Sequence, residues 1–133
     1  MPTPDVWKFY EALAETSRAD LTSRQRGVAA ICDLRQEVAS GGFDCYFSYW
    51  GGDTAQEALE ALPTSLGQDW AVLLSEAMDL LGSPYPTDQG SREARVDSLG
   101  PDDPFAALDQ RLYDLEAVTD ADDLLSALLR EPA

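Results

Sequence analysis

The sequence predicts an all-α fold, built as a single compact multi-helix domain of about six to eight helices over residues 1–133. Apolar residues recur at helical spacing along most of the chain, which is the main basis of this prediction. Residues that start or stop helices separate the periodic segments. Apolar residues make up 44% of the chain, so one ordinary core can form without disulfides or a structural metal.

The first part of the chain is expected to form three helices, the first over residues 5–17. The second helix starts at residues 22–25, whose sequence Thr-Ser-Arg-Gln fits a capping box. It stops at Gly41-Gly42, because glycine accepts the left-handed geometry of a helix end. The aromatic segment 43–50 could be a strand by propensity, but its position between two Gly-Gly pairs favours a short buried helix.

The later helices are predicted from their caps. Asp53 or Thr54 caps one helix, and Gly67-Gln68-Asp69 starts the next. Residues 82–91 are expected to be a loop because they hold two prolines and two glycines, and a short helix at 92–99 follows. Asp102 or Asp103, with Pro104 at the first helical position, opens another helix, and the last runs from about 120 to 130. The side chains expected to face the core are Val6, Trp7, Tyr10, Leu13, Ala14, Val28, Ile31, Leu34, Val38, Ala55, Ala58, Leu59, Leu62, Trp70, Leu73, Leu74, Ala77, Leu80, Leu81, Phe105, Leu108, Leu112, Leu115, Leu124, Leu125, Leu128 and Leu129.

Negative charge is the outlier of the composition. The chain has 25 acidic residues, nine basic residues and a formal net charge of −16. The imbalance grows along the chain, since residues 1–66 carry ten acids and five bases whereas residues 67–133 carry fifteen acids and four bases. A field of this sign repels nucleic acid and anionic membranes and attracts basic surfaces. We therefore expect a basic protein as partner, and neither direct binding of nucleic acid nor association with a membrane.

Helical geometry predicts where the acidic side chains point. The acids of the helix after residue 52 fall opposite its apolar side, with no basic residue among them. In the helix after residue 102, Asp102, Asp109 and Glu116 recur every seven residues along one flank. Several other acids stand at helix starts, where they complement the helix dipole. The acids predicted to form the partner-binding surface are Asp53, Glu57, Glu60, Asp102, Asp103, Asp109 and Asp114.

Three explanations of this acidity remain open from the residues alone. It could form a binding surface for a basic partner, serve solubility or adaptation to high salt, or hold a hard metal ion. The chain has no D-x-D-x-D-G loop, which disfavours calcium, and we predict no metal site and no cofactor.

Enzymatic chemistry is poorly supported by the residues. The absence of histidine removes the commonest general base and the commonest transition-metal ligand. Arg35 and Glu37 are the only charged pair expected to lean inward, and a buried ion pair explains them better than catalysis. Cys32 and Cys45 form no CxxC pair and are expected to be small, reduced core residues, a redox switch between them being the alternative. We therefore predict that the protein is not an enzyme.

A cytoplasmic location is expected. The N-terminus lacks the basic region and apolar stretch of a signal peptide, and no apolar run approaches the 18 residues typical of a membrane helix. An aromatic side chain among Tyr49, Trp50 and Tyr85, if it lies at the surface, would suit the contact of a homodimer.

The segment 37–47, Glu-Val-Ala-Ser-Gly-Gly-Phe-Asp-Cys-Tyr-Phe, resembles the signature E-V-x-N-G-G-F-x-Q-Y-F of a bacterial family first labelled only as a domain of unknown function. The similarity continues downstream and covers about residues 28–130. Ser40 and Cys45 depart from the usual asparagine and glutamine. Within the motif, Gly41 and Gly42 are expected to turn the chain, while Phe43, Tyr46 and Phe47 pack in the core.

The resemblance to this family implies an all-α, non-enzymatic protein. The characterised member of the family is similar to DNA in its surface charge. That member is an acidic DNA mimic that occupies the DNA-binding surface of a transcription factor. The leading hypothesis is therefore a protein that binds the DNA-binding surface of a basic partner and competes with DNA. A different protein-binding module, such as an immunity protein that neutralises a toxin, is the alternative, together with acidity that serves only solubility or salt adaptation.

Overall fold

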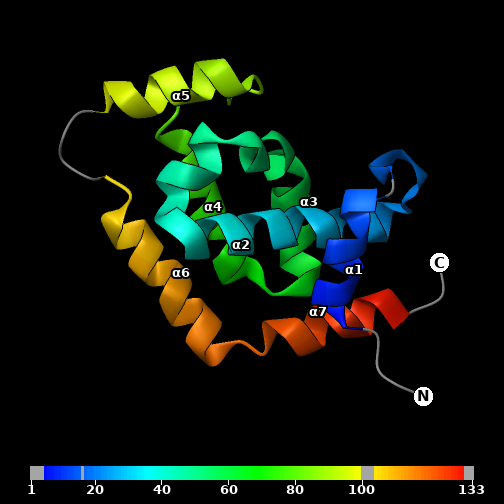
Figure 1. Cartoon of the computed structure of the whole chain (residues 1–133). Coiled ribbons are helices and arrows are strands. Elements are labelled where there is room, and N and C mark those ends of the chain that lie inside the picture. The colour runs from blue at the N-terminus through cyan, green and yellow to red at the C-terminus, as the bar shows by residue number, and fades with distance from the viewer. Residues whose placement is uncertain (1–4, 16, 100–103, 131–133) are drawn as a thin grey trace.

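Helix α2, Ser23–Ser48, is the element around which the others are arranged in the computed structural model (Figure 1). The structure describes residues 5–15, 17–99 and 104–130, and over these ranges it has seven α-helices and no β-strand. The predicted all-α fold of six to eight helices is thus confirmed. The remaining elements are α1 (Val6–Ala12), η1 (Leu13–Glu15), η2 (Arg18–Asp20), η3 (Trp50–Thr54), α3 (Ala55–Ser65), α4 (Gln68–Asp79), α5 (Gln89–Ser98), α6 (Ala106–Val118) and α7 (Ala121–Arg130), where η marks a 3₁₀-helix.

The predicted start of α2 and the predicted interruption at Gly41-Gly42 are confirmed. Thr22 Oγ1 accepts a hydrogen bond from the Gln25 backbone N–H at 3.1 Å, and Gln25 Oε1 accepts one from the Thr22 N–H at 2.9 Å, which completes the capping box. At the other end, Gly41 and Gly42 leave the helical conformation, and Gly42 has φ +78°. Helical geometry then resumes over residues 43–48, so α2 consists of two helical segments joined by a break, and the predicted short aromatic helix is its second segment.

The helices pack on α2 from several sides. α3 and α4 form a pair, α6 lies against α2 and α4, and α5 packs at the edge of the molecule near η3 (Figure 1). α1 and α7 come from opposite ends of the chain but lie side by side. The Val6 backbone N–H donates to Ser126 Oγ at 3.0 Å, and both residues are buried. No helix in the described part of the chain is long and apolar enough to cross a membrane.

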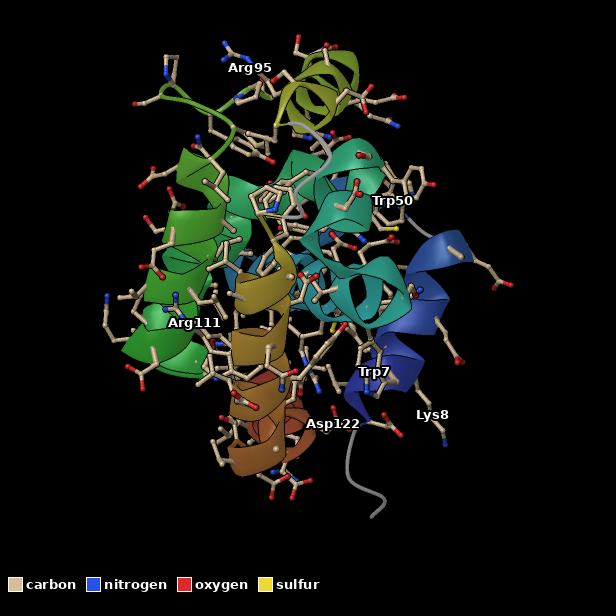
Figure 2. All side chains as sticks on the ribbon, turned by 90° about the vertical axis from the view of Figure 1, so that its left-hand side faces the viewer. Trp7, Lys8, Trp50, Arg95, Arg111 and Asp122 are labelled. Carbon is tan, nitrogen blue, oxygen red and sulfur yellow. The ribbon has the colours of Figure 1, made fainter. Side chains whose placement is uncertain are left out.

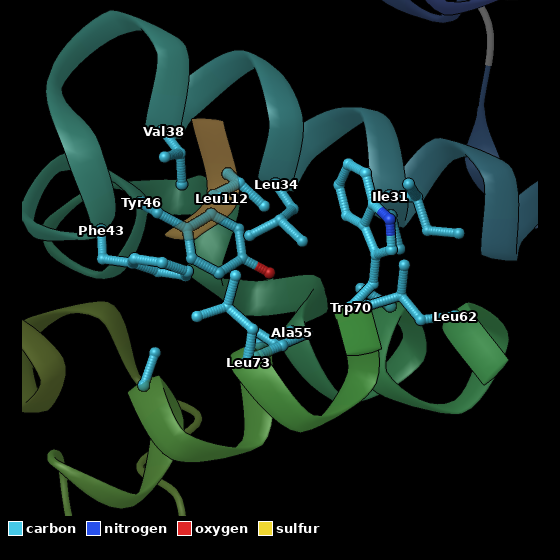
Figure 3. Packing of buried hydrophobic residues seen from close by; sticks show 14 of the residues in the cluster. Ile31, Leu34, Val38, Phe43, Tyr46, Ala55, Leu62, Trp70, Leu73 and Leu112 are labelled. Atoms are coloured by element: carbon cyan, nitrogen blue, oxygen red, sulfur yellow. The ribbon is translucent and has the colours of Figure 1, made fainter. Parts of the chain in front are cut away.

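The core is one cluster to which every described α-helix except α5 contributes a buried hydrophobic side chain. The predicted structural role of the Gly-Gly-Phe motif is confirmed, since Phe43, Tyr46 and Phe47 are fully buried. The Phe43 and Phe47 rings stack with their centroids 5.8 Å apart, and Phe105 lies 5.7 Å from Phe47. Figure 3 shows Tyr46 beside Phe43, with Val38 and Leu34 above it. The Gly41-Gly42 break allows the second segment of α2 to fold these rings back into the core.

Three predicted boundaries are wrong. The first helix ends at Ala12 and gives way to η1. α5 begins at Gln89 within the predicted loop, because Asp88 caps it by accepting a hydrogen bond from the Ser91 N–H at 2.8 Å. α6 begins at Ala106 with Phe105 at its cap position, so Pro104 precedes the helix. The burial of the Phe105 ring against α2 determines this start, a tertiary contact that cap signals do not report.

Two leucines predicted to face the core are partly exposed. α4 ends at Asp79, so Leu80 lies outside the regular helix and Leu81 takes the buried position. On α7, Ala121 and Leu125 face the core at a spacing of four residues, which turns Leu124 toward solvent. A run of adjacent leucines does not specify which of them a helix buries.

Candidate partner-binding surface

Glu57 and Glu60 occupy the outer face of α3, as predicted. Both side chains are exposed, and Ala58 and Leu62 on the same helix are buried. The two glutamates line a shallow hollow of about 430 Å³ together with Arg26 and Gly27 of α2. Neither glutamate makes an ion pair within the described part of the chain, and the Arg26 guanidinium donates to the Ala19 carbonyl oxygen at 2.9 Å. This face of α3 therefore presents two exposed carboxylates that form no ion pair with a described residue.

Asp53 is exposed, but unlike Glu57 and Glu60 it is paired with a basic residue, which comes from another helix. It lies in η3, where its carboxylate is paired with Arg92 from α5. The Arg92 side chain is fully buried, and it also donates to the carbonyl oxygens of Phe47 at 3.0 Å and Thr87 at 2.8 Å. A Cβ at Gly52 would lie 2.8 Å from Arg92 Nε, so only glycine leaves room for the guanidinium. Asp53 thus helps to hold α5 on the molecule.

Asp109 is also turned toward its own chain. Its Oδ1 accepts a hydrogen bond of 2.8 Å from the Phe43 backbone N–H, the first amide after the Gly41-Gly42 break. Its Oδ2 would lie 2.4 Å from a Cβ at Gly42. Asp109 therefore caps the second segment of α2 from a different helix, as a side chain caps a helix start. This contact assigns Asp109 a structural role instead of the outward position that the helical spacing predicted.

The heptad flank of α6 that contains Asp109 faces α2. Glu116, seven residues later, accepts two hydrogen bonds of 2.8 Å from Arg35 Nε and Nη2. Arg35 Nη1 donates to Asp122 of α7 at 2.8 Å, and the guanidinium lies over the Trp7 ring, 5.2 Å from its centroid. Arg35 is inward-facing, as predicted, but its partners are Glu116 and Asp122 and not Glu37. This ion-pair network ties α2 to α6 and α7 and does not form part of an outer surface.

Asp114 retains the predicted outward position. It is exposed on α6 and accepts a hydrogen bond of 3.0 Å from Gln110 one turn earlier. It forms no ion pair with any described residue. Asp102 and Asp103 lie outside the described residues. Of the seven predicted surface acids, the structure therefore places Glu57, Glu60 and Asp114 outward without an ion pair, keeps Asp53 exposed but paired with Arg92, and turns Asp109 toward Phe43.

Asp33 is a buried charge that the helical pattern did not reveal. It has no exposed surface, and it accepts hydrogen bonds from Tyr10 Oη at 2.6 Å, Thr54 Oγ1 at 2.7 Å and both terminal nitrogens of Arg18 at 2.8 Å. Burial, together with the hydrogen bond to this carboxylate, raises the pKa of Tyr10. The signal available in the sequence is the position of Asp33 inside the otherwise apolar run 28–34. A charge in such a run requires partners from other segments.

These pairings separate the charges of the molecule by depth. Arg18, Arg35 and Arg92 direct their guanidinium groups toward Asp33, Glu116, Asp122 and Asp53, and Arg111 of α6 is paired with Glu76 of α4. Figure 2 shows Arg111 on the side formed by α4 and α6 and Asp122 below, near Trp7. The guanidinium groups of Arg35 and Arg92 are buried, while Asp53, Asp122 and Glu76 keep about half of their side chains exposed, so the surplus of carboxylates lies on the outside.

Carboxylates also crowd the start of α7. A hydrogen bond with Asp123 and the negative charge of Asp123 raise the pKa of the Asp120 carboxyl. Within the described ranges, no three acidic or cysteine side chains are arranged to hold a metal ion. Cys32 and Cys45 are free thiols; burial raises the pKa of Cys32 to about 12, while Cys45 is only half-buried. The Cys32 thiol therefore stays protonated, and unreactive, at neutral pH.

The aromatic residues considered for a dimer contact differ in exposure. Tyr49 and Trp50 are each about half exposed, and Arg18 lies over the Trp50 ring, 5.7 Å from its centroid. Tyr85 is half-buried and donates a hydrogen bond of 2.7 Å to the Gly52 carbonyl oxygen, so it belongs to the packing around α5. A homodimer formed through Tyr49 and Trp50 stays a prediction.

Comparison with known proteins identifies one family. The model of the family described as DMP19-like protein matches residues 19–131, which is most of the chain. No curated protein and no solved structure is similar enough to the chain to count as a match.

Proposed function

Because the chain belongs to the DMP19-like family, we propose that it is an acidic DNA mimic that binds the DNA-binding surface of a basic protein, such as a transcription factor, and competes with DNA for it. The proposed role is binding without catalysis. Membership of this family of DNA mimics is consistent with the proposal, which also requires a surface that a DNA-binding protein can accept in place of DNA.

The observation that carries the proposal is the separation of charge by depth. The Arg35 and Arg92 side chains are buried and Arg18 is directed toward the buried Asp33, whereas Glu57 and Glu60 stay exposed and form no ion pair with a described residue. B-DNA carries one negative charge per ~1.7 Å of helix axis, and its partners hold matching arrays of lysine and arginine. Outward carboxylates on a rigid helical body can contact such an array and release its counterions in the same way.

The proposal is tested by capture of a partner at increasing salt. The purified chain, immobilised and exposed to the native lysate at low salt, is expected to retain a nucleic-acid-binding protein, and salt is expected to release it because the contact is electrostatic. Added duplex DNA should displace the captured protein. Recovery of no nucleic-acid-binding protein, or a complex that DNA does not displace, would contradict DNA mimicry. Capture of a toxin instead would favour an immunity protein.

Two double variants of equal charge separate a defined surface from diffuse acidity. Glu57→Gln/Glu60→Gln removes two carboxylates from α3, and Glu11→Gln/Glu93→Gln removes two exposed carboxylates from α1 and α5. We expect the α3 variant to lower the salt concentration at which the partner dissociates by about twofold, and the matched variant to change it much less. Equal effects of the two variants would show that only bulk charge matters, which is the explanation by solubility or salt adaptation.

A further inference from the structure

An apolar groove with acidic edges runs between α4 and α6. It has a volume of about 410 Å³ and is lined by Asp69, Val72, Leu73, Arg111, Asp114, Leu115 and Val118. Val118 is 82% exposed and Val72 is 44% exposed, although both lie next to residues that pack in or against the core. Figure 2 shows α6 toward the viewer with α4 beside it and Arg111 on this side of the molecule. The groove therefore offers exposed apolar surface on a molecule whose exterior is otherwise strongly charged.

The lining residues follow helical spacing on both walls. On α6 they recur at 111, 114–115 and 118, and on α4 the lining begins at 69 and continues at 72–73. Seven residues of helix span about 10 Å, so the α6 wall is two turns long. A short helix laid along such a groove presents apolar side chains at the same spacing of three and four residues.

The charge at the groove is negative. Asp69 and Asp114 are both exposed, one on each wall, and neither forms an ion pair with a described residue. Arg111 is the only cation among the lining residues, and its guanidinium is paired with Glu76, so it does not balance these two carboxylates. An occupant of the groove must therefore combine apolar side chains along its centre with positive charge at its edges.

We infer that the groove between α4 and α6 binds a basic amphipathic helix of the protein partner, with apolar side chains seated on Val72, Leu115 and Val118 and lysine or arginine side chains beside Asp69 and Asp114. This inference rests on the proposed function in that it takes the partner to be a basic protein. The groove adds a contact with the partner that DNA cannot make. Carboxylates alone attract any basic protein, whereas an apolar groove of fixed length selects a partner whose helix matches it.

The full chain and a synthetic peptide test the groove directly. The probe is a peptide of about 16 residues, roughly 24 Å long as a helix, with leucines on one face and lysines elsewhere. One control peptide has the same composition with the leucines spread over all faces, and another replaces lysine by glutamate. On the ¹⁵N-labelled chain, the probe is expected to shift the backbone amide signals of Val72, Leu115 and Val118. Shifts centred on Glu57 and Glu60, or equal shifts with either control peptide, would overturn the inference.

A matched pair of variants measures the apolar contribution. Val72→Ser/Val118→Ser removes exposed methyl groups from the groove, and Leu124→Ser removes from α7 a side chain whose exposure, 43%, is similar to that of Val72. We expect the groove variant to bind the probe about tenfold more weakly and the α7 variant to stay within about twofold of the unsubstituted chain. Circular dichroism shows whether each variant is folded, and the signal shifts on the unsubstituted chain locate the site independently of the variants. Equal binding by the groove variant and the unsubstituted chain would overturn the inference.

Salt distinguishes the two parts of the contact. The loss of affinity for the probe peptide caused by Val72→Ser/Val118→Ser should persist from about 50 mM to about 500 mM salt. The loss of affinity caused by Asp69→Asn/Asp114→Asn should shrink over this range. The same variants separate this inference from the proposed function. If a captured DNA-binding protein is displaced by DNA but is indifferent to the groove variants, the groove inference fails and DNA mimicry stands. If the basic peptide occupies the groove but no nucleic-acid-binding protein is captured, DNA mimicry fails and the groove stands.

Discussion

The Tyr46 hydroxyl is a polar group placed within an apolar core. The side chain is fully buried, and among the described residues Tyr46 Oη is the buried side-chain atom for which no hydrogen-bond partner is found. Burial raises the pKa of this hydroxyl well above its ordinary value, so it remains protonated. The ring itself packs beside Phe43 and Phe47, with centroids 6.3 and 5.1 Å away. Packing of the ring, and not bonding of the hydroxyl, therefore stabilises this position.

Replacement of Tyr46 by phenylalanine should not destabilise the protein. Tyr46→Phe keeps the ring and removes an unpaired polar atom whose burial costs about 1–3 kcal/mol, so the free energy of unfolding is expected to stay equal or to rise by about 1 kcal/mol. Urea denaturation followed by circular dichroism measures it. Phe47→Leu is a useful control, because it removes part of a buried ring and should destabilise. A loss above about 1 kcal/mol for Tyr46→Phe would indicate that the hydroxyl bonds a buried water.

At the scale of elements, the break in α2 and the helix α6 depend on each other. Gly42 adopts a backbone conformation that side chains disfavour, and the next amide, of Phe43, donates to Asp109. The space beside Gly42 is filled by the Asp109 carboxylate. The break that turns the aromatic rings into the core is therefore stabilised by a side chain that comes from another helix.

Alanine at Gly42 should cost more than alanine at Gly67. Both glycines have positive φ, which costs a side chain about 1–3 kcal/mol, but no atom lies within 4 Å of a Cβ at Gly67. Gly42→Ala also displaces Asp109 from the Phe43 amide, which adds about 1 kcal/mol. Chemical denaturation of the two variants measures the difference. In a double-mutant cycle, Asp109→Ala should cost less in the Gly42→Ala background than alone, and full additivity would contradict the coupling.

The same contact explains why part of the candidate surface escaped prediction. Helical spacing places Glu57 and Glu60 outward correctly, because α3 buries only its opposite face. It fails for Asp109, whose partner lies 66 residues away. Asp53 is exposed, but spacing could not indicate that Arg92, on a helix that packs against η3, would pair with it. Spacing within a helix identifies its faces, but it does not tell which face another helix covers. The capping box was predictable because its hydrogen bonds are local, and the Gly-Gly break because glycine adopts positive φ more readily than other residues.

At the scale of the whole molecule, the net charge of −16 opposes folding. The exposed carboxylates repel one another, and salt screens this repulsion, whereas the guanidinium groups of Arg35 and Arg92 are buried and their ion pairs are screened less. The fold is therefore stabilised by its buried charges and destabilised by its surface charges. This arrangement suits a binding surface, since a basic partner removes the repulsion when it covers the carboxylates.

Added salt should therefore stabilise the protein. Between about 20 mM and about 300 mM sodium chloride, the melting temperature is expected to rise by a few degrees, because surface repulsion is screened more than the buried pairs. Thermal unfolding followed by circular dichroism measures this rise. A variant with Glu57, Glu60, Asp69 and Asp114 replaced by their amides should show a smaller rise. A melting temperature that falls with salt would show that attraction between surface charges outweighs their repulsion.

The contact between α1 and α7 sets the order in which parts of the fold can form during synthesis of the chain. The Val6 N–H of α1 donates to Ser126 Oγ of α7, which lies 120 residues later in the chain. Trp7 Nε1 donates to Asp122, which is also on α7, at 3.0 Å. On the ribosome, α1 is made before the other described α-helices, but these partners exist only when α7 has been translated. Until then α1 can contact α2, through Tyr10 and Asp33, while α2, α3 and α4, which are neighbours in sequence, can already pack. Of the described α-helices, the one made earliest is thus among the last to complete its packing.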